Sequence, residues 1–298
     1  MHSISKARTQ PRRELSPWAI CLLAIFALLS TTADAIQLPS LSLRRSDCVT
    51  VAGFRWRTDY KAACKEAANA EKMLLVNFVP GGRSDAQRGL EKILLEDNAV
   101  RDQLKDYVLV RVSDDERARG LKAGIRRKNR DRLIDDAAFK HLGRSAGLAI
   151  IDYQHAKQPF YGKVVTALPF KVGKYYRWKN SHLAVALGLP AGTITQRTMV
   201  WAVRTHPEHP RSTVGKLHPA LAAAAAKQSA YQASIGVQGH QNWETRFHHV
   251  VARTHSGTAS EVVAESWENQ DLIDSCIDCV QSWRHSPGHW SVVRRHHR

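Results

Sequence analysis

Residues with reactive side chains gather near the C-terminus of this 298-residue chain, where the sequence reads CIDCVQSWRHSPGHW from Cys276 to Trp290. A Cys-x-x-Cys pair is typical of a redox centre or of half a metal site. The imidazole of His289, in the SPGH motif, can ligate a metal or move a proton. Upstream, His240 and Glu261 supply a second imidazole and a carboxylate. Two imidazoles and a carboxylate can bind zinc, or can form a hydrogen-bonded cluster without any metal.

The cysteines are candidates for a disulfide or for structural thiols rather than for catalysis. After residue 35 they are Cys48, Cys64, Cys276 and Cys279, and Cys48–Cys64 is one plausible bridge. Four cysteines allow three pairing schemes, between which the sequence does not choose. Cys276 and Cys279 lie three residues apart in an expected helix that also carries several aspartates. Neighbouring carboxylates raise a thiol pKa, so thiol exchange is disfavoured.

The elements expected before residue 176 alternate between helices and short apolar strands. Buried strands are predicted at 73–79, 106–113, 147–153 and 161–168, where apolar runs are bounded by turn residues. Helices are predicted at 58–72, 85–104 and 133–142, and Asp85 is a plausible N-cap of the second. This order predicts an α/β fold.

The arrangement KMLLVNFV…LEKILLEDNAV…DYVLVRV resembles the thioredoxin-like family, over roughly Phe54 to Tyr176. In that family a Cys-x-x-Cys follows the first central strand, and a cis-proline precedes a later one. Here the corresponding stretches are PGGRSDAQRG, with Ser84 and Gln87 near the thiol positions, and RSAG before residue 148. Because both features are missing, we expect a thioredoxin-like domain that is redox-inactive.

Four motifs follow one another toward the C-terminus, where helices are expected at 195–206, 217–233 and 271–283. The motifs are the entry LHPAL at Leu217–Leu221, Gly239-His240 after that helix, ASEVVA at Ala259–Ala264, and WRHSPGH at Trp283–His289. In this order they resemble the CAP superfamily, the cysteine-rich secretory protein or SCP-like extracellular domain.

The CAP resemblance implies an α-β-α sandwich and a cleft formed by His240, Glu261 and His289. It also implies that a divalent cation such as zinc can be held there, with His240 and His289 as metal ligands. Ser286 stands where animal and plant members have a second glutamate, and this leaves Glu265 and Glu268 as candidates to replace it. Only SVVRRHHR follows Trp290, so SVV predicts one short strand and the sandwich is expected to be truncated.

The first residues are typical of a secretory signal peptide. Four basic residues precede the apolar run WAICLLAIFALL (18–29), and Ala33-Asp34-Ala35 fits a cleavage site. The alternative is an uncleaved anchor, although twelve apolar residues are short for a span that needs about 20. No later run is long and apolar enough to span, so we expect a soluble protein that is secreted or periplasmic.

The charge of the chain favours anionic partners. The net charge is +17, and removal of four basic and two acidic leader residues leaves about +15. Such a surface attracts anionic envelope polymers, lipid head groups or, without sequence specificity, nucleic acid. The densest basic run (117–132) is best explained as a solvated loop and helix face, and the terminal Arg294–Arg298 stretch as a frayed tail. No nucleic-acid motif accompanies either, so no specific nucleic-acid partner is expected.

Three functions follow as hypotheses. The favoured one is a secreted, basic, non-enzymatic CAP-domain protein that binds an extracellular or envelope ligand. The alternatives are a metal-assisted hydrolase, for example a peptidase, that uses the same cleft, and a thiol oxidoreductase that uses Cys276 and Cys279. The expected organisation is a signal peptide (1–35), a linker (36–53), the thioredoxin-like domain (54–176), a second linker (177–193) and the CAP-type domain (194–298).

Overall fold

The computed structural model describes residues 47–82, 84–115, 132–171 and 180–297. The signal peptide, most of the first linker, nearly all of the basic run at 117–132, and residues 177–179 of the second linker lie outside these ranges. No helix among the described residues is both long and apolar enough to cross a membrane. Residues 44–298 form one compact unit.

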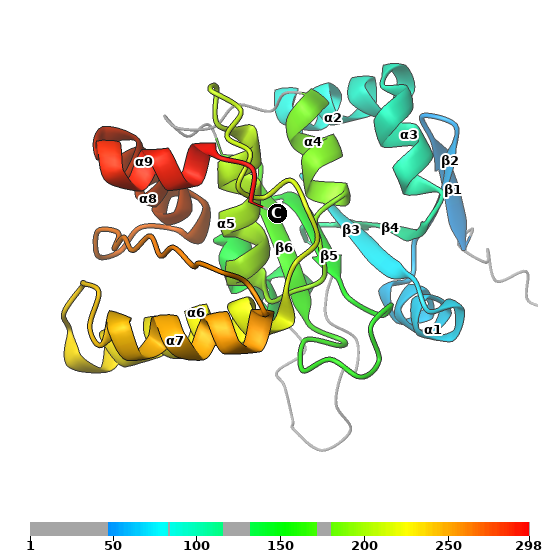
Figure 1. Cartoon of the computed structure of the whole chain (residues 1–298). Coiled ribbons are helices and arrows are strands. Elements are labelled where there is room, and N and C mark those ends of the chain that lie inside the picture. The colour runs from blue at the N-terminus through cyan, green and yellow to red at the C-terminus, as the bar shows by residue number, and fades with distance from the viewer. Residues whose placement is uncertain (1–46, 83, 116–131, 172–179, 298) are drawn as a thin grey trace, which may run out of the picture. The chain divides into compact units, whose positions relative to one another are not determined.

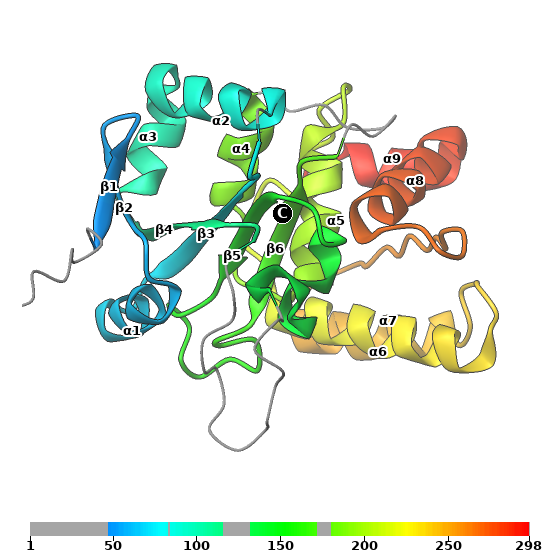
Figure 2. The ribbon, with the colours of Figure 1, turned by 180° about the vertical axis from the view of Figure 1, so that it is seen from behind.

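The described chain is mixed α/β and is built on one six-stranded sheet (Figures 1 and 2). The strands are β1 (Cys48–Val51), β2 (Phe54–Arg57), β3 (Met73–Val79), β4 (Tyr107–Ser113), β5 (Gly147–Ile151) and β6 (Val164–Pro169). They lie in the order β1-β2-β4-β3-β5-β6. Strand β4 pairs in parallel with β2 and β3, whereas the β1–β2, β3–β5 and β5–β6 pairs are antiparallel.

Alternation along β3 explains how the sheet buries both of its faces. Leu74 and Phe78 pack into a cluster with helix α1 (Tyr60–Ala70), whereas Leu75 packs into the cluster on the opposite face. Successive strand side chains point to opposite faces, so a continuous apolar run is what a strand covered on both sides requires. The strands expected at 73–79, 106–113, 147–153 and 161–168 are confirmed within a few residues.

Two of the expected helices are wrong in detail. The helix expected over 85–104 is broken at Asp97 into α2 (Asp85–Glu96) and α3 (Asn98–Leu104), because the Asp97 side chain accepts a hydrogen bond from Val100 N and caps α3. Ser84, rather than Asp85, caps α2. The stretch at 133–142 forms two short 3₁₀ segments, Leu133–Asp135 and Ala137–Leu142, in place of one α-helix.

The residues after the sheet form helices only, within the described range. These helices are α4 (Asn180–Leu187), α5 (Ile194–Thr205), α6 (Pro219–Ile235), α7 (Trp243–Thr254), α8 (Leu272–His285) and α9 (Pro287–Arg294). The strand expected at SVV is wrong, because Ser291–Val293 belong to α9. Pro287 at the first turn of α9 is pre-organised for a helix, and Trp290 and Val293 share its buried side. The α-β-α sandwich expected for 194–298 is therefore not confirmed.

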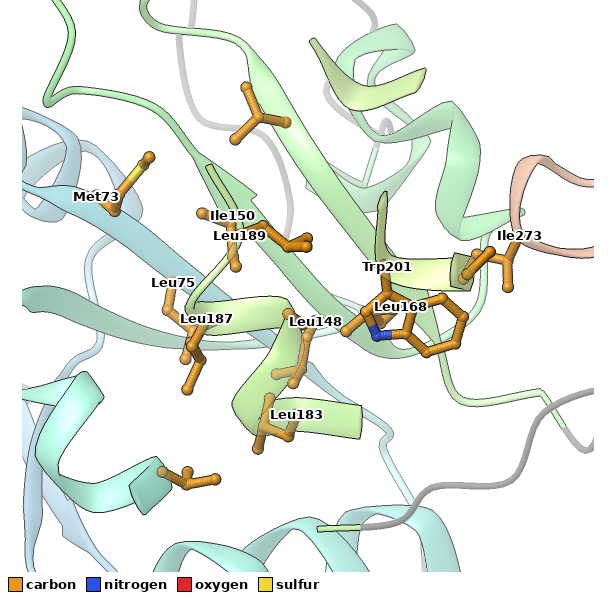
Figure 3. Packing of buried hydrophobic residues seen from close by; sticks show 14 of the residues in the cluster. Met73, Leu75, Leu148, Ile150, Leu168, Leu183, Leu187, Leu189, Trp201 and Ile273 are labelled. Carbon is orange, nitrogen blue, oxygen red and sulfur yellow. The ribbon is translucent and has the colours of Figure 1, made fainter. Parts of the chain in front are cut away.

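Helix α4, inside the expected linker at 177–193, and helices α5, α8 and α9 after it share one hydrophobic core with the sheet. Figure 3 shows Leu148 and Leu168 of the sheet beside Leu183 of α4, Trp201 of α5 and Ile273 of α8. The core continues into α8 and α9 through Trp283 and Trp290 (6–8% exposed). The expected separation into two domains is thus not visible as a break in this core.

The guanidinium of Arg197 connects α5 to the sheet through a hydrogen bond to Thr166 of β6. Although only 1% of this residue is exposed, it donates to the carbonyls of Leu189 (2.9 Å) and Pro190 (2.9 Å) and to Thr166 Oγ1 of β6 (3.0 Å). A buried cation is tolerated when its donors are satisfied in this way. Burial lowers the pKa of Arg197, and Tyr107 and Asp152 act in the opposite direction.

Helices α6 and α7 form a pair that is barely covered. Only Gln228 of α6 is buried, and none of the residues of α7 is. The pair extends along one side of the molecule below α5 and α8 in Figure 1. The connection between these two helices carries His240.

Candidate functional site

We keep the name cleft residues for His240, Glu261 and His289, which come from three segments that the fold brings together. His240 lies between α6, which ends at the left-handed Gly236 (φ 63°), and α7. Glu261 lies in the non-helical segment between α7 and α8. His289 lies in the first turns of α9. These segments lie 21 and 28 residues apart in the chain, so only tertiary packing can make them meet.

The segment that carries Glu261 is positioned by α8 and by the packing of its apolar side chains. Val262 and Ala264 pack against the main core. Trp283 Nε1 of α8 donates to the carbonyl of Val263 at 3.0 Å, and Gln238 Nε2 donates to the same oxygen at 3.3 Å. These bonds hold Glu261 beside the α6–α7 connection.

The two imidazoles and the carboxylate are in contact. His240 Nδ1 donates to Glu261 Oε1 at 2.9 Å. The rings of His240 and His289 stack with centroids 5.8 Å apart and an angle of 24° between their planes. His289 Nδ1 lies 2.9 Å from Ser286 Oγ. The three residues that the sequence singled out thus lie together in the structure. Ser286 is a hydrogen-bond partner of His289.

The sequence interpretation missed Arg246, the strongest partner of Glu261. Arg246 Nη2 donates to Glu261 Oε1 at 2.8 Å, and Arg246 Nη1 donates to Oε2. The guanidinium also lies 5.1 Å from the ring of Trp243, over its face. A bidentate guanidinium–carboxylate pair is among the stronger charge-assisted contacts. A half-buried glutamate needs a cation as its partner, but the sequence does not show which of several nearby arginines provides it.

The electrostatics of the cleft centre on Glu261, whose side chain is 15% exposed. Burial alone raises the pKa of this carboxyl, but hydrogen bonds from Arg246 and His240 outweigh burial. The net pKa therefore lies below the ordinary value of 4.5. Glu261 is an anion at neutral pH, and its charge is matched by Arg246.

The arrangement fits a three-ligand metal centre poorly. No cluster of three or more His, Cys, Asp or Glu side chains suited to a metal occurs in the described part of the chain. Both oxygens of Glu261 already accept hydrogen bonds from Arg246, so metal ligation by this carboxylate would displace a guanidinium. Glu265 and Glu268 are exposed and are not brought into such a cluster. Among the described residues, neither imidazole uses its Nε2 in a hydrogen bond, so His240 and His289 keep one nitrogen each for a ligand.

None of the four described cysteines belongs to this group of cleft residues. Cys64 is a free thiol, so the plausible Cys48–Cys64 bridge is not formed. Cys48 Sγ instead accepts from Arg55 Nε at 3.0 Å and from Arg57 Nη1 at 3.3 Å. Cys276 and Cys279 are free and buried on α8, where burial raises their pKa values to about 12 and about 11. Thiols with such pKa values are protonated at neutral pH, as expected for structural residues.

The stretch PGGRSDAQRG, compared above with a redox motif, holds structural contacts at Ser84 and Gln87. Ser84 Oγ accepts a hydrogen bond from Gln87 N at 3.2 Å and caps α2. The Gln87 side chain donates to Glu91 at 2.9 Å. Neither residue type can carry disulfide exchange.

Comparisons with models of protein families, with curated proteins and with solved structures found no match for this chain.

Proposed function

We propose that this chain is a secreted, non-enzymatic binding protein whose cleft of His240, Glu261 and His289 takes an extracellular or envelope ligand. The observation that carries the proposal is the contact of these three residues. They were singled out by motifs far apart in the sequence, and they lie within hydrogen-bonding or stacking distance of one another. A chance set of motif matches has no reason to converge in this way.

The CAP resemblance and the secreted location are part of the same proposal. Support for CAP-like character comes from the contacts that join His240, Glu261 and His289, the residues of the matched motifs. The leader at 1–35 is the support for export. The sheet order β2-β4-β3-β5-β6, with β3 and β4 parallel and with β5 and β6 antiparallel to their neighbours, supports a thioredoxin-like origin of the first half.

Binding is favoured over catalysis because the carboxylate is already committed. A general base needs a free lone pair within reach of the proton that it accepts. Both Glu261 oxygens are engaged, and one partner is a guanidinium that holds the carboxylate in its weakly basic, ionised form. The two Nε2 atoms remain to receive hydrogen-bonding groups of a ligand.

The test is co-sedimentation of the mature chain with an insoluble envelope fraction rich in carboxylates and phosphates. The ionic strength should be about 0.15 M or higher, so that diffuse attraction is screened beyond ~8 Å. We expect the wild type to sediment, and the double variant His240→Ala/His289→Ala to stay in solution. His249→Ala is the matched control, because His249 is an exposed histidine of α7 outside the cleft. Equal sedimentation of all three proteins, or of none, would overturn the proposal.

The metal-assisted hydrolase remains the second candidate, and zinc bound by His240 and His289 is its requirement. Elemental analysis of the purified protein, paired with peptide hydrolysis before and after chelation, distinguishes the two functions. Stoichiometric zinc that either histidine substitution removes, together with hydrolysis that chelation abolishes, would replace the binding function by this one.

A further inference from the structure

A second candidate binding site lies on α9, on the side opposite the cleft. A pocket of about 400 Å³ is lined by Arg284, His285, Pro287, Trp290, Ser291 and Arg294. On α9 the lining positions 287, 290, 291 and 294 follow the i, i+3, i+4, i+7 spacing of one helix side. His289 projects from the other side of the same helix, toward His240. Helices α8 and α9 lie next to each other in both views (Figures 1 and 2).

The lining is cationic and carries no carboxylate. Two guanidinium groups and one imidazole line the pocket, together with two apolar side chains and one hydroxyl. Arg294 is exposed and makes no ion pair within the described part of the chain. A guanidinium presents donors in a planar fork that matches the oxygens of carboxylates and phosphates.

A carboxylate at the rim indicates what these side chains can bind. Arg284 Nε donates to Glu208 Oε1, and Trp290 Nε1 donates to Glu208 Oε2 at 3.1 Å. The guanidinium of Arg284 also lies over the ring of Trp290, 5.5 Å from its centroid. Glu208 therefore neutralises the charge of Arg284. The guanidinium of Arg294 has no such partner among the described residues and can pair with an anionic ligand.

We propose that this pocket binds a phosphate ester, with Arg294 donating to the phosphate oxygens and the organic part resting on Pro287 and Trp290. The volume exceeds what one phosphate group needs, and the apolar wall accounts for the remaining space. His285, at the end of α8, adds a further donor at the lining. The site shares no side chain with the cleft, so its ligand and the ligand of the cleft can be tested separately.

Phenyl phosphate is the probe, and isothermal titration of the mature chain is the measurement. We expect saturable binding with a stoichiometry of one, and binding of inorganic phosphate that is weaker because it lacks a group for Trp290. Arg294→Gln should lower the affinity for phenyl phosphate about tenfold, since a charge-assisted contact is lost. Arg253→Gln should leave it unchanged. Arg253 is the matched control, because it is an exposed arginine in the last turn of α7 and its replacement changes the net charge equally.

Vesicles of phosphatidylcholine with and without phosphatidic acid identify the source of the phosphate. Retention on phosphatidic acid that Arg294→Gln weakens and Arg253→Gln does not supports a lipid head group. Binding of phenyl phosphate without such retention supports a soluble ester. Absence of saturable phenyl phosphate binding, or equal weakening by both substitutions, overturns the site. His240→Ala/His289→Ala should not affect this binding, so failure here is separate from failure of the proposed function.

Discussion

Glu261 holds the cleft together through its charge, and that charge makes the cleft sensitive to acid. At neutral pH the carboxylate accepts hydrogen bonds from Arg246 and from His240. Its pKa in the folded protein lies below 4.5 despite burial, because these donors favour the ionised form. Its contribution to folding is therefore fully present above the pKa of the unfolded state, and is lost as the pH falls through the folded pKa.

We expect Glu261→Gln to lower the free energy of unfolding by about 1–3 kcal/mol at pH 7, because charged hydrogen bonds are lost. The difference from the wild type should begin to shrink once the pH falls below the ordinary carboxyl pKa of 4.5, where the unfolded chain takes up a proton, and should vanish as the pH falls through the lower pKa of the folded protein. Urea denaturation at a series of pH values measures this difference. Glu244→Gln, at an exposed position of α7, is the control. A difference that stays constant down to pH 3 would contradict the role given to Glu261.

The sequence predicted the three cleft residues but not their partners. His240, Glu261 and His289 stand in motifs whose order and residue types carry a signal. Arg246 stands in no such motif, and arginines are frequent in this basic chain. Which arginine pairs with Glu261 depends on how α7 lies against the segment that carries Glu261. Ser286 was noted only as a departure from a glutamate, whereas in the structure its hydroxyl contacts His289.

Helix α8 shows how an element decides the role of a motif. Its N-cap is Asp271, and its buried face carries Cys276, Cys279, Val280 and Trp283. The Cys-x-x-Cys spacing places both thiols on that face, away from a helix N-terminus that would lower a thiol pKa. Burial instead raises both pKa values well above neutrality, and the carboxylates of Asp278 and Glu265 add to the rise at Cys279.

We therefore expect Cys276 and Cys279 of the native protein to resist iodoacetamide at pH 8, and to react once urea unfolds the chain. Mass spectrometry of the peptide that contains both residues measures the extent of alkylation. Ser282→Cys is the matched control, because residue 282 is exposed on the same helix and should react rapidly in the native state. Alkylation of either native cysteine at the rate of the control would revive the thiol oxidoreductase hypothesis.

Local patterns predicted some elements and missed others for physical reasons. Strands β3 and β5 are short apolar runs between turn residues, and such runs can be predicted as strands without tertiary information. The break at Asp97 depends on a capping contact that competes with continuation of the helix. The SVV segment has β-branched residues, yet it follows a proline at a helix start and packs Val293 into the core, so tertiary burial overrides strand propensity.

At the scale of the whole molecule, one hydrophobic core runs from the sheet into the C-terminal helices. The stretch 177–193, expected to be a linker, contains α4, whose Leu183 and Leu187 belong to this core. The apolar run HLAVALGL (182–189) favours a helix, but the packing of that helix against the sheet depends on tertiary contacts that composition does not show. Residues from 44 onward accordingly form one compact unit.

A shared core predicts one cooperative unfolding transition for the residues from 44 onward. Leu75→Ala, in the centre of the sheet, should cost about 2–5 kcal/mol, and Trp283→Ala, in α8, about 3–5 kcal/mol. Each should shift the whole transition, measured in parallel by circular dichroism and tryptophan fluorescence. Leu221→Ala is the control, because Leu221 is 45% exposed on α6, and such surface changes usually stay within about 0.5 kcal/mol. If Trp283→Ala instead shifted one of two separate transitions and left the other in place, the two halves would fold as independent domains despite their contact.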